Sequence, residues 1–148
     1  VIVVYIPLFF HAFFGIRLIF ESSVQPSYTY FSHLLYWLQR ISGIGVLLFI
    51  IAHVWNAQLG PWFAGTWGTH YEHLSSGFAD PDSGLITKGV YLLGTVGAVF
   101  HFSNGLNTFC MTWGIALTPK SQIRVRILSI FLFLILAASA FYALSAIW

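Results

Sequence analysis

Charged residues are scarce in this sequence. Asp, Glu, Lys and Arg together make up 7% of its 148 residues, 58% are hydrophobic, and the mean hydropathy is +0.83. A soluble domain typically carries about 25% charged residues, so this composition excludes an ordinary water-soluble fold. The net charge of only +2 gives no basis for a nucleic-acid partner.

Cysteine occurs once, as Cys110. A single cysteine cannot form an internal disulfide, and it excludes both the C-x-x-C-H motif of covalent haem attachment and clusters held by several cysteines. Any haem in this chain would therefore be bound non-covalently. The opening stretch VIVVYIPLFF also lacks an initiator methionine and the basic start of a signal peptide. We expect the sequence to be the C-terminal part of a longer chain.

Long apolar runs are abundant. A membrane crossing needs about 20 apolar residues, and four runs reach this length, at residues 1–20, 34–58, 89–117 and 125–148. The bilayer core offers no water to backbone groups, so each run is predicted to be a helix. The sequence therefore predicts an all-α integral membrane bundle with four transmembrane helices in one domain, residues 1–148.

The basic residues indicate how the bundle is oriented. Five of the six lie at the first and third connections, and these are Arg17, Arg40, Lys120, Arg124 and Arg126. Cytoplasmic loops carry an excess of Lys and Arg. We therefore predict that these two connections face the cytoplasm and that the long second connection, around residues 59–88, faces outward.

Three histidines interrupt the apolar runs: His11, His53 and His101. An ionisable ring at bilayer depth is costly and marks a functional site by default. A neutral imidazole is also a common ligand of haem iron. We therefore interpret the chain as a membrane cytochrome and these histidines as its candidate iron ligands.

The depth of each histidine suggests a pairing. At a helical rise of about 1.5 Å per residue, His11 lies roughly 9 Å from the inner boundary marked by Arg17. His101 falls at middle to inner depth, whereas His53, roughly 20 Å beyond Arg40, falls in the outer half. This predicts that His11 and His101 share one haem, and that a second haem at His53 takes its other ligand from elsewhere.

Glycines accompany two of these histidines. Gly15 follows His11 and Gly105 follows His101 at the four-residue spacing that shares a helix face, and Gly97 precedes His101 by one turn. Small residues there suit a macrocycle lying against the helix, but they suit close helix packing equally well.

The remaining histidines, His33, His70 and His73, carry less weight. His70 and His73 flank Glu72 in the outer connection. A loop metal site is one interpretation, but neighbouring histidines in a polar loop are more often simply solvated.

Several short motifs point to a family. At QRISG (39–43), HVW (53–55) and HFSNG (101–105) the sequence resembles the cytochrome b membrane anchor of succinate dehydrogenase, or succinate:quinone oxidoreductase. TWGI (112–115) and TPKSQ (118–122) fit as well. The nearest type is the single-subunit, five-helix, two-haem anchor of Gram-positive bacteria and its relatives. The resemblance runs over essentially the whole sequence and depends on the order and spacing of the motifs.

The resemblance implies a ligand set. Anchors of this type have axial histidines on their first four helices, and His11, His53 and His101 match those of the second, third and fourth. It pairs His11 with His101 on the haem nearer the cytoplasm, in agreement with the depth argument. The first helix and its ligand are absent from this sequence, and we expect truncation rather than loss. Two b haems are then expected in the full protein, one of them with both ligands here.

The resemblance also implies partners and a reaction. A flavoprotein and an iron–sulfur subunit would dock on the cytoplasmic face of a bacterial inner membrane. Electrons from succinate would pass through iron–sulfur clusters and haem to a quinone, expected to be menaquinone. The dicarboxylate chemistry belongs to a partner, so we expect no catalytic residue in this chain, and whether it counts as an enzyme by itself stays open.

Three polar residues are candidates for holding the haem propionates: Arg17, Arg40 and Ser42. Cations and hydroxyls bind carboxylates through charge-assisted hydrogen bonds, although positive-inside anchoring accounts for the cations equally well. Arg40 and Ser42 carry more weight because R-x-S-G resembles a pattern of these anchors. Weaker candidates for cofactor, polar-network or docking contacts are Lys120, Ser103, Asn104, Glu21 and Gln25.

Three alternatives remain open. One is the cytochrome b subunit of another quinone-linked enzyme, such as a hydrogenase or formate dehydrogenase. The second is a non-redox channel or transporter whose histidines relay protons. The third is a purely structural anchor whose histidines only bridge helices.

Overall fold

The computed structural model describes residues 2–21, 30–66 and 70–147, and all of the regular structure in these ranges is helical. The elements are α1 (Ile2–Glu21), α2 (Tyr30–Val54), the π-helical turn η1 (Trp55–Leu59), α3 (Gly60–Phe63), α4 (His70–Ala79), α5 (Gly84–Thr112) and α6 (Pro119–Ser145). Within these ranges, four helical stretches are long and apolar enough to cross a membrane: Val3–Glu21, His33–Phe63, Gly84–Thr112 and Pro119–Ser145. The predicted all-α membrane fold is confirmed.

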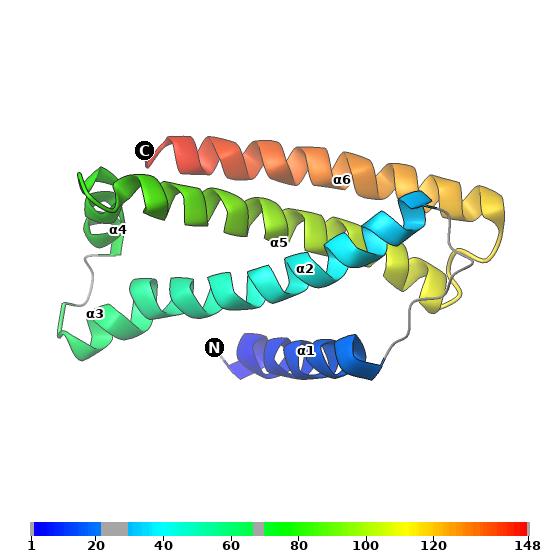
Figure 1. Ribbon diagram of the computed structural model, residues 1–148, viewed down its shortest axis with the longest axis horizontal. Coiled ribbons are helices and arrows are strands. Elements are labelled where there is room, and N and C mark those ends of the chain that lie inside the picture. Colours follow the sequence, from blue (N-terminus) through cyan, green and yellow to red (C-terminus); the bar gives the residue numbers. More distant parts are fainter. Residues whose placement is uncertain (1, 22–29, 67–69, 148) are drawn as a thin grey trace.

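The long helices run alternately up and down (Figure 1). α5 lies between α2 and α6 and packs extensively against both, whereas α1 lies at the free side of α2 and contacts it much less. The end of α1, the start of α2 and the turn between α5 and α6 all lie at one end of the bundle, and α3 and α4 lie at the other. This is the arrangement that the distribution of basic residues requires.

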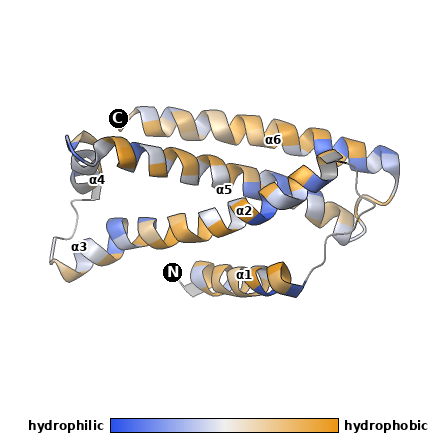
Figure 2. Cartoon of the chain, viewed as in Figure 1, coloured by the Kyte–Doolittle hydropathy of each residue, from blue (hydrophilic) through white to orange (hydrophobic). Residues whose placement is uncertain are grey.

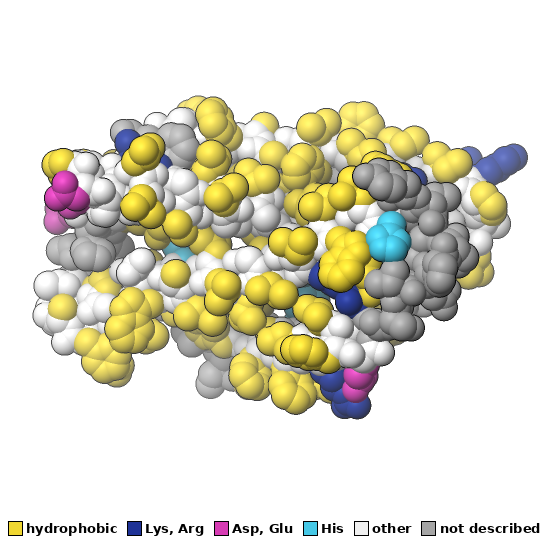
Figure 3. Space-filling view, viewed as in Figure 1, with side chains coloured by type: hydrophobic (Ala, Val, Ile, Leu, Met, Phe, Trp, Pro, Cys, Tyr) yellow, Lys and Arg dark blue, Asp and Glu magenta, His cyan; other side chains and the backbone are white. Residues whose placement is uncertain are grey.

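The surface of the bundle is apolar. Hydrophobic residues dominate the long helices, most evenly along α6 (Figure 2), and hydrophobic side chains cover most of the visible face (Figure 3). Among the described residues only four hydrophobic side chains are buried, namely Phe78, Tyr91, Ala116 and Leu144. Exposed apolar area on this scale marks an interaction surface rather than a face in contact with water. Here the lipid hydrocarbon is the natural partner.

α5 begins and ends earlier than the apolar run predicts. The Asp80 carboxylate accepts hydrogen bonds from the amides of Ser83 and Asp82 at 2.7 and 2.9 Å. These bonds, with that of the Ser83 amide foremost, lower the pKa of Asp80. The resulting turn starts the helix at Gly84 instead of residue 89. At the other end the chain turns at Gly114, whose φ of 71° suits glycine, so the helix stops at Thr112 instead of 117.

The start of α6 carries a reciprocal cap. The Ser121 amide donates to Thr118 Oγ1 at 3.2 Å, and the Thr118 amide donates to Ser121 Oγ at 3.0 Å. Pro119 occupies the first turn, where it needs no hydrogen-bond donor. The N-cap is therefore Thr118, and Ser121 is its capping-box partner three residues later.

The second apolar run extends further than predicted. It continues from α2 through η1 and α3 to Phe63, beyond the expected end at residue 58. Pro61 lies in the first turn of α3, a position that a helix tolerates. The outward end of this span therefore carries Trp55 and Trp62, in keeping with the aromatic belt that membrane helices place at the interface.

In the outer half of the bundle, Gly94 of α5 packs directly against α2. A Cβ at this position would overlap the ring of Phe49, which packs against the backbone of α5 there. Small residues allow such close approach between membrane helices. The α2–α5 spacing therefore depends on the absence of a side chain at Gly94.

Replacing Gly94 with alanine is expected to lower the free energy of unfolding by about 1–3 kcal/mol, the usual cost of overpacking. Denaturant unfolding in detergent measures the change. Gly89→Ala on the same helix is the matched control, because a Cβ there meets nothing within 4 Å. Equal stability of the two variants would contradict the proposed close approach.

Candidate functional site

A cavity of about 760 Å³ lies between α1, α2 and α5. Its size falls within the range of about 300–1,000 Å³ that is usual for cofactor and ligand pockets. The walls are mostly apolar, and the polar residues among them are His11, Gln39, Arg40, His101, Thr108 and Thr112. Such a lining suits a largely apolar ligand and leaves a few polar groups to orient it.

His11 of α1 and His101 of α5 both line this cavity, and their rings lie close together in a T-shaped arrangement. Their ring centroids are 6.1 Å apart, and the ring planes are inclined at 81°. An imidazole nitrogen binds a metal at about 2 Å, and the ring centre lies about 1 Å behind that nitrogen. Two opposed imidazoles on one ion therefore place their centres about 6 Å apart. The separation fits a single metal ion held between the two rings.

The His101 ring is fixed by α2. Its Nδ1 lies 3.1 Å from the Gln39 carbonyl oxygen and 3.3 Å from Ser42 Oγ. The carbonyl can only accept a hydrogen bond, so its contact with Nδ1 is a hydrogen bond in the tautomer that carries the proton on Nδ1. Nε2 then keeps its lone pair, which is the form that binds a metal. The His11 ring, in contrast, has no hydrogen-bond partner within the described part of the chain.

Glycines make room for this arrangement. A Cβ on Gly43 would lie 2.9 Å from His101 Cε1, and a Cβ on Gly105 would lie 3.3 Å from Gln39 Nε2. At Gly15 a Cβ would meet nothing within 4 Å, so this residue leaves open space on the α1 wall. Gly97 lies in ordinary contact distance of Val46 and serves helix packing.

Arg40 ties α1 to α2. Its guanidinium donates to the carbonyl oxygens of Leu18 and Ile19, at 3.3 and 3.4 Å, near the end of α1. It also lies 4.2 Å from the centre of the Tyr36 ring. The last carbonyls of a helix lack intrahelical donors, so Arg40 satisfies two of the groups that α1 leaves free while lining the cavity.

The other polar residues that the sequence suggested for the site differ in their contacts. Arg17 forms an exposed ion pair with Glu21, with 2.6 Å between Nε and Oε1. Ser42 contacts His101 instead of the cavity wall. Asn104 donates to Gln39 Oε1 at 2.8 Å, so it belongs to a polar network as predicted. Ser103 is buried and has no hydrogen-bond partner among the described residues.

Some predictions concern residues that the structure does not describe. Gln25 lies outside the described residues, and so do the side chains of His70 and His73. The loop metal site considered for them stays untested. In the described ranges no group of three or more His, Cys, Asp or Glu side chains is arranged to hold a metal ion.

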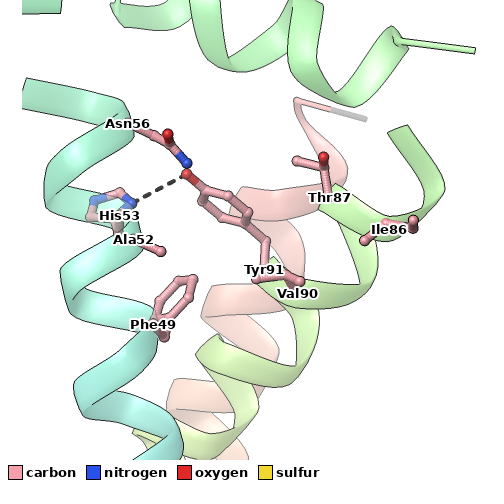
Figure 4. Close-up of a pocket in the computed structure, with 8 residues that line it drawn as sticks. All are labelled: Phe49, Ala52, His53, Asn56, Ile86, Thr87, Val90 and Tyr91. Atoms are coloured by element: carbon pink, nitrogen blue, oxygen red, sulfur yellow. Dashed lines mark hydrogen bonds between the residues drawn. The ribbon is translucent and has the colours of Figure 1, made fainter. Parts of the chain in front are cut away.

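His53 lines a separate, smaller pocket of about 180 Å³ towards the other end of the α2–α5 interface. Its Nδ1 lies 3.4 Å from the Tyr91 hydroxyl, and its ring stacks on Phe49 with centroids 5.8 Å apart. Figure 4 shows Tyr91 reaching from α5 toward His53, with Asn56 beside it. Sequence reasoning missed Tyr91, although a tyrosine in an apolar span needs a hydrogen-bond partner when buried.

Comparisons with known proteins identify relatives of this chain. Residues 27–141 match the family described as the transmembrane subunit of succinate dehydrogenase/fumarate reductase. The chain is 31% identical over 149 residues to the succinate dehydrogenase cytochrome b558 subunit of Bacillus subtilis (strain 168). That alignment covers 100% of this chain and 69% of the relative. No solved structure matches the chain.

Replacing Arg40 with glutamine is expected to loosen the end of α1, because the long cationic donor to the Leu18 and Ile19 carbonyls is lost. A loss of about 1 kcal/mol corresponds to roughly five-fold faster amide exchange in the last turn of α1. Hydrogen exchange with mass spectrometry measures this. Arg124→Gln removes the same charge from an exposed position on α6 and is expected to leave α1 unchanged. A similar effect of both variants would contradict the role of Arg40.

Proposed function

Because the chain belongs to the family of succinate dehydrogenase/fumarate reductase transmembrane subunits, we propose that it carries electrons between the iron–sulfur subunit of such a complex and a membrane quinone through b-type haem. The observation that carries the proposal is the pair of imidazoles, His11 and His101, 6.1 Å apart across an apolar cavity. The sequence motifs resemble the succinate dehydrogenase anchor, and the family membership agrees with that resemblance.

We propose that His11 and His101 are the axial ligands of one haem b. The donor set fits, because two neutral imidazoles are a known haem ligation. The cavity supplies apolar walls, and the missing side chain of Gly15 leaves space on the α1 side. When bound, the haem supplies reversible one-electron transfer. With both histidines binding the iron, no position would be left for oxygen, and the group would supply electron transfer only.

Residues around the two histidines orient one of them and place a positive charge in the cavity wall. His101 donates from Nδ1 to the Gln39 carbonyl, which keeps Nε2 free for iron and raises the electron density on the ring. Arg40 lies in the cavity wall, where it offers a positive charge to a haem propionate. Ser42 acts through His101, and Arg17, at the same end of α1, is the weaker candidate for propionate contact.

We propose His53 as a ligand of a second haem. It lies apart from the first pair, and only Phe49 and Tyr91 make ring contacts with it among the described side chains. Its second ligand is therefore not one of the described histidines. The quinone is expected to be menaquinone.

We further propose that residues 1–148 form one domain and that the flavoprotein and iron–sulfur subunits dock at its cytoplasmic end. The basic residues Arg17, Lys120, Arg124 and Arg126 lie towards that end of the bundle. Positive-inside anchoring orients this end to the cytoplasm, where a water-soluble dehydrogenase can reach it.

The first test is the haem content of the purified full-length protein, measured by pyridine haemochrome and reduced-minus-oxidised spectra. A b-type spectrum is expected. His11→Ala and His101→Ala should each lose one and the same haem or turn it high-spin, and His53→Ala should affect a different one. His33→Ala, outside both pockets, is the control and should keep the full content. A folded protein without haem would refute the proposal and favour a proton relay or a structural anchor.

The second test exploits two glycines on one helix. Gly43→Ala places a methyl group against the His101 ring, whereas Gly45→Ala meets nothing within 4 Å. We expect Gly43→Ala to displace the ring and to lower haem occupancy at the His11–His101 site at least several-fold. Gly45→Ala should retain wild-type occupancy. Wild-type occupancy in Gly43→Ala, measured on the same preparations, would show that the ring does not need this space.

A further inference from the structure

The side-chain amides of Gln39 on α2 and Asn104 on α5 form a hydrogen-bonded pair next to His101. Asn104 Nδ2 donates to Gln39 Oε1 at 2.8 Å, and Gln39 Nε2 donates to the His101 carbonyl oxygen at 3.1 Å. The His101 carbonyl can only accept, so it fixes which end of the Gln39 amide faces it. The Gln39 oxygen is then left for Asn104, and each member of the pair determines the orientation of the other.

This pair lies where polar contacts are costly to lose. Gln39, His101 and Asn104 are all half-buried between two membrane helices, and a polar group left without a partner there keeps the cost of its burial. The missing side chain of Gly105 leaves the space that Gln39 occupies, since a Cβ would lie 3.3 Å from its Nε2. The packing of α5 is thus fitted to the Gln39 side chain.

Gln39 contacts His101 through both its backbone carbonyl and its side-chain amide. Its backbone carbonyl lies 3.1 Å from Nδ1 of the ring, and its side-chain Nε2 lies 3.1 Å from the His101 carbonyl and 3.2 Å from Nδ1. One residue of α2 therefore contacts both the backbone and the ring of the histidine on α5. Movement of the Gln39 side chain would shift His101 relative to α2.

The opposite histidine has no comparable support. His11 is exposed apart from its ring contact with His101, and α1 packs only sparsely on α2. The contacts of the described residues therefore define the position of His101 far more tightly than that of His11. The geometry of the pair depends mainly on what holds His101.

We propose that Gln39, held in place by Asn104, is the positioning residue that fixes the place and ring rotation of His101. This inference rests on the proposed haem ligation by His11 and His101. Gln39 acts through His101, and Asn104 acts through Gln39. Groups that orient a ligating histidine typically change metal affinity by about 10–100-fold when they are removed.

The test uses Gln39→Leu and Asn104→Ala in the full-length protein within its complex. Gln39→Leu is expected to weaken haem retention at the His11–His101 site about ten-fold. It should also shift the low-spin electron paramagnetic resonance signal of that haem, which reports the relative rotation of the two imidazole planes, and shift its midpoint potential. Asn104→Ala should shift the same signals in the same direction by a smaller amount, because the Gln39 side chain remains.

Gln58→Leu is the matched control, since it makes the same chemical change on an exposed residue of η1. It should leave the signal and potential of the His11–His101 haem at wild-type values. In the double variant Gln39→Leu/Asn104→Ala the shifts should equal those of Gln39→Leu alone, because Asn104 acts only through Gln39. Asn104→Ala tests the inference even where Gln39→Leu fails to fold.

The outcomes separate this inference from the proposed function. Wild-type protein without haem, or His101→Ala with full haem, would overturn both. Loss of haem in His101→Ala, combined with unchanged retention, resonance signal and potential in Gln39→Leu and Asn104→Ala, would overturn the positioning role alone. Additive shifts in the double variant would overturn the dependence of Asn104 on Gln39.

Discussion

The contact between His101 and the backbone of α2 is the constraint on which the site depends. The ring can reach the Gln39 carbonyl because Gly43, one turn later on α2, has no side chain. The carbonyl accepts a hydrogen bond from Nδ1–H, so the other ring nitrogen keeps its lone pair. The absence of a side chain at Gly43 thus leaves the space in which the His101 ring reaches this carbonyl.

The membrane explains why such contacts have these effects. Lipid covers the outer faces of the helices without competing for hydrogen bonds, and helix association there depends on close packing and polar contacts. The α2–α5 interface has both, with Gly94 admitting Phe49 in the outer half and Gln39 joining Asn104 in the inner half. These two points hold α2 and α5 at a fixed distance along most of their length.

The sequence predicted the helices well and their ends less well, for physical reasons. The length of an apolar run indicates how much of the chain can lie in the hydrocarbon, so the runs predicted all four membrane-spanning helices of the described residues. The ends of α5 depend instead on the turn at Asp80 and the positive φ of Gly114, which apolarity does not record. The depth of each residue along its helix predicted that His11 and His101 lie close together, and their rings are in contact. The roles of Gln39 and Tyr91 depend on the rotation of α2 against α5, which no single run of residues specifies.

The two histidines of the cavity differ in how they are held, and this asymmetry follows from the packing. His101 belongs to the helix that packs extensively on both sides, against α2 and α6, whereas His11 belongs to a helix that, within the described residues, packs only sparsely on α2 and touches α5 through the His11–His101 ring contact. The tie that Arg40 makes to the end of α1 lies two turns from His11 and leaves its ring free. Among the described contacts, α5 and α2 therefore hold His101 in place, whereas α1 presents His11 with far fewer contacts around it.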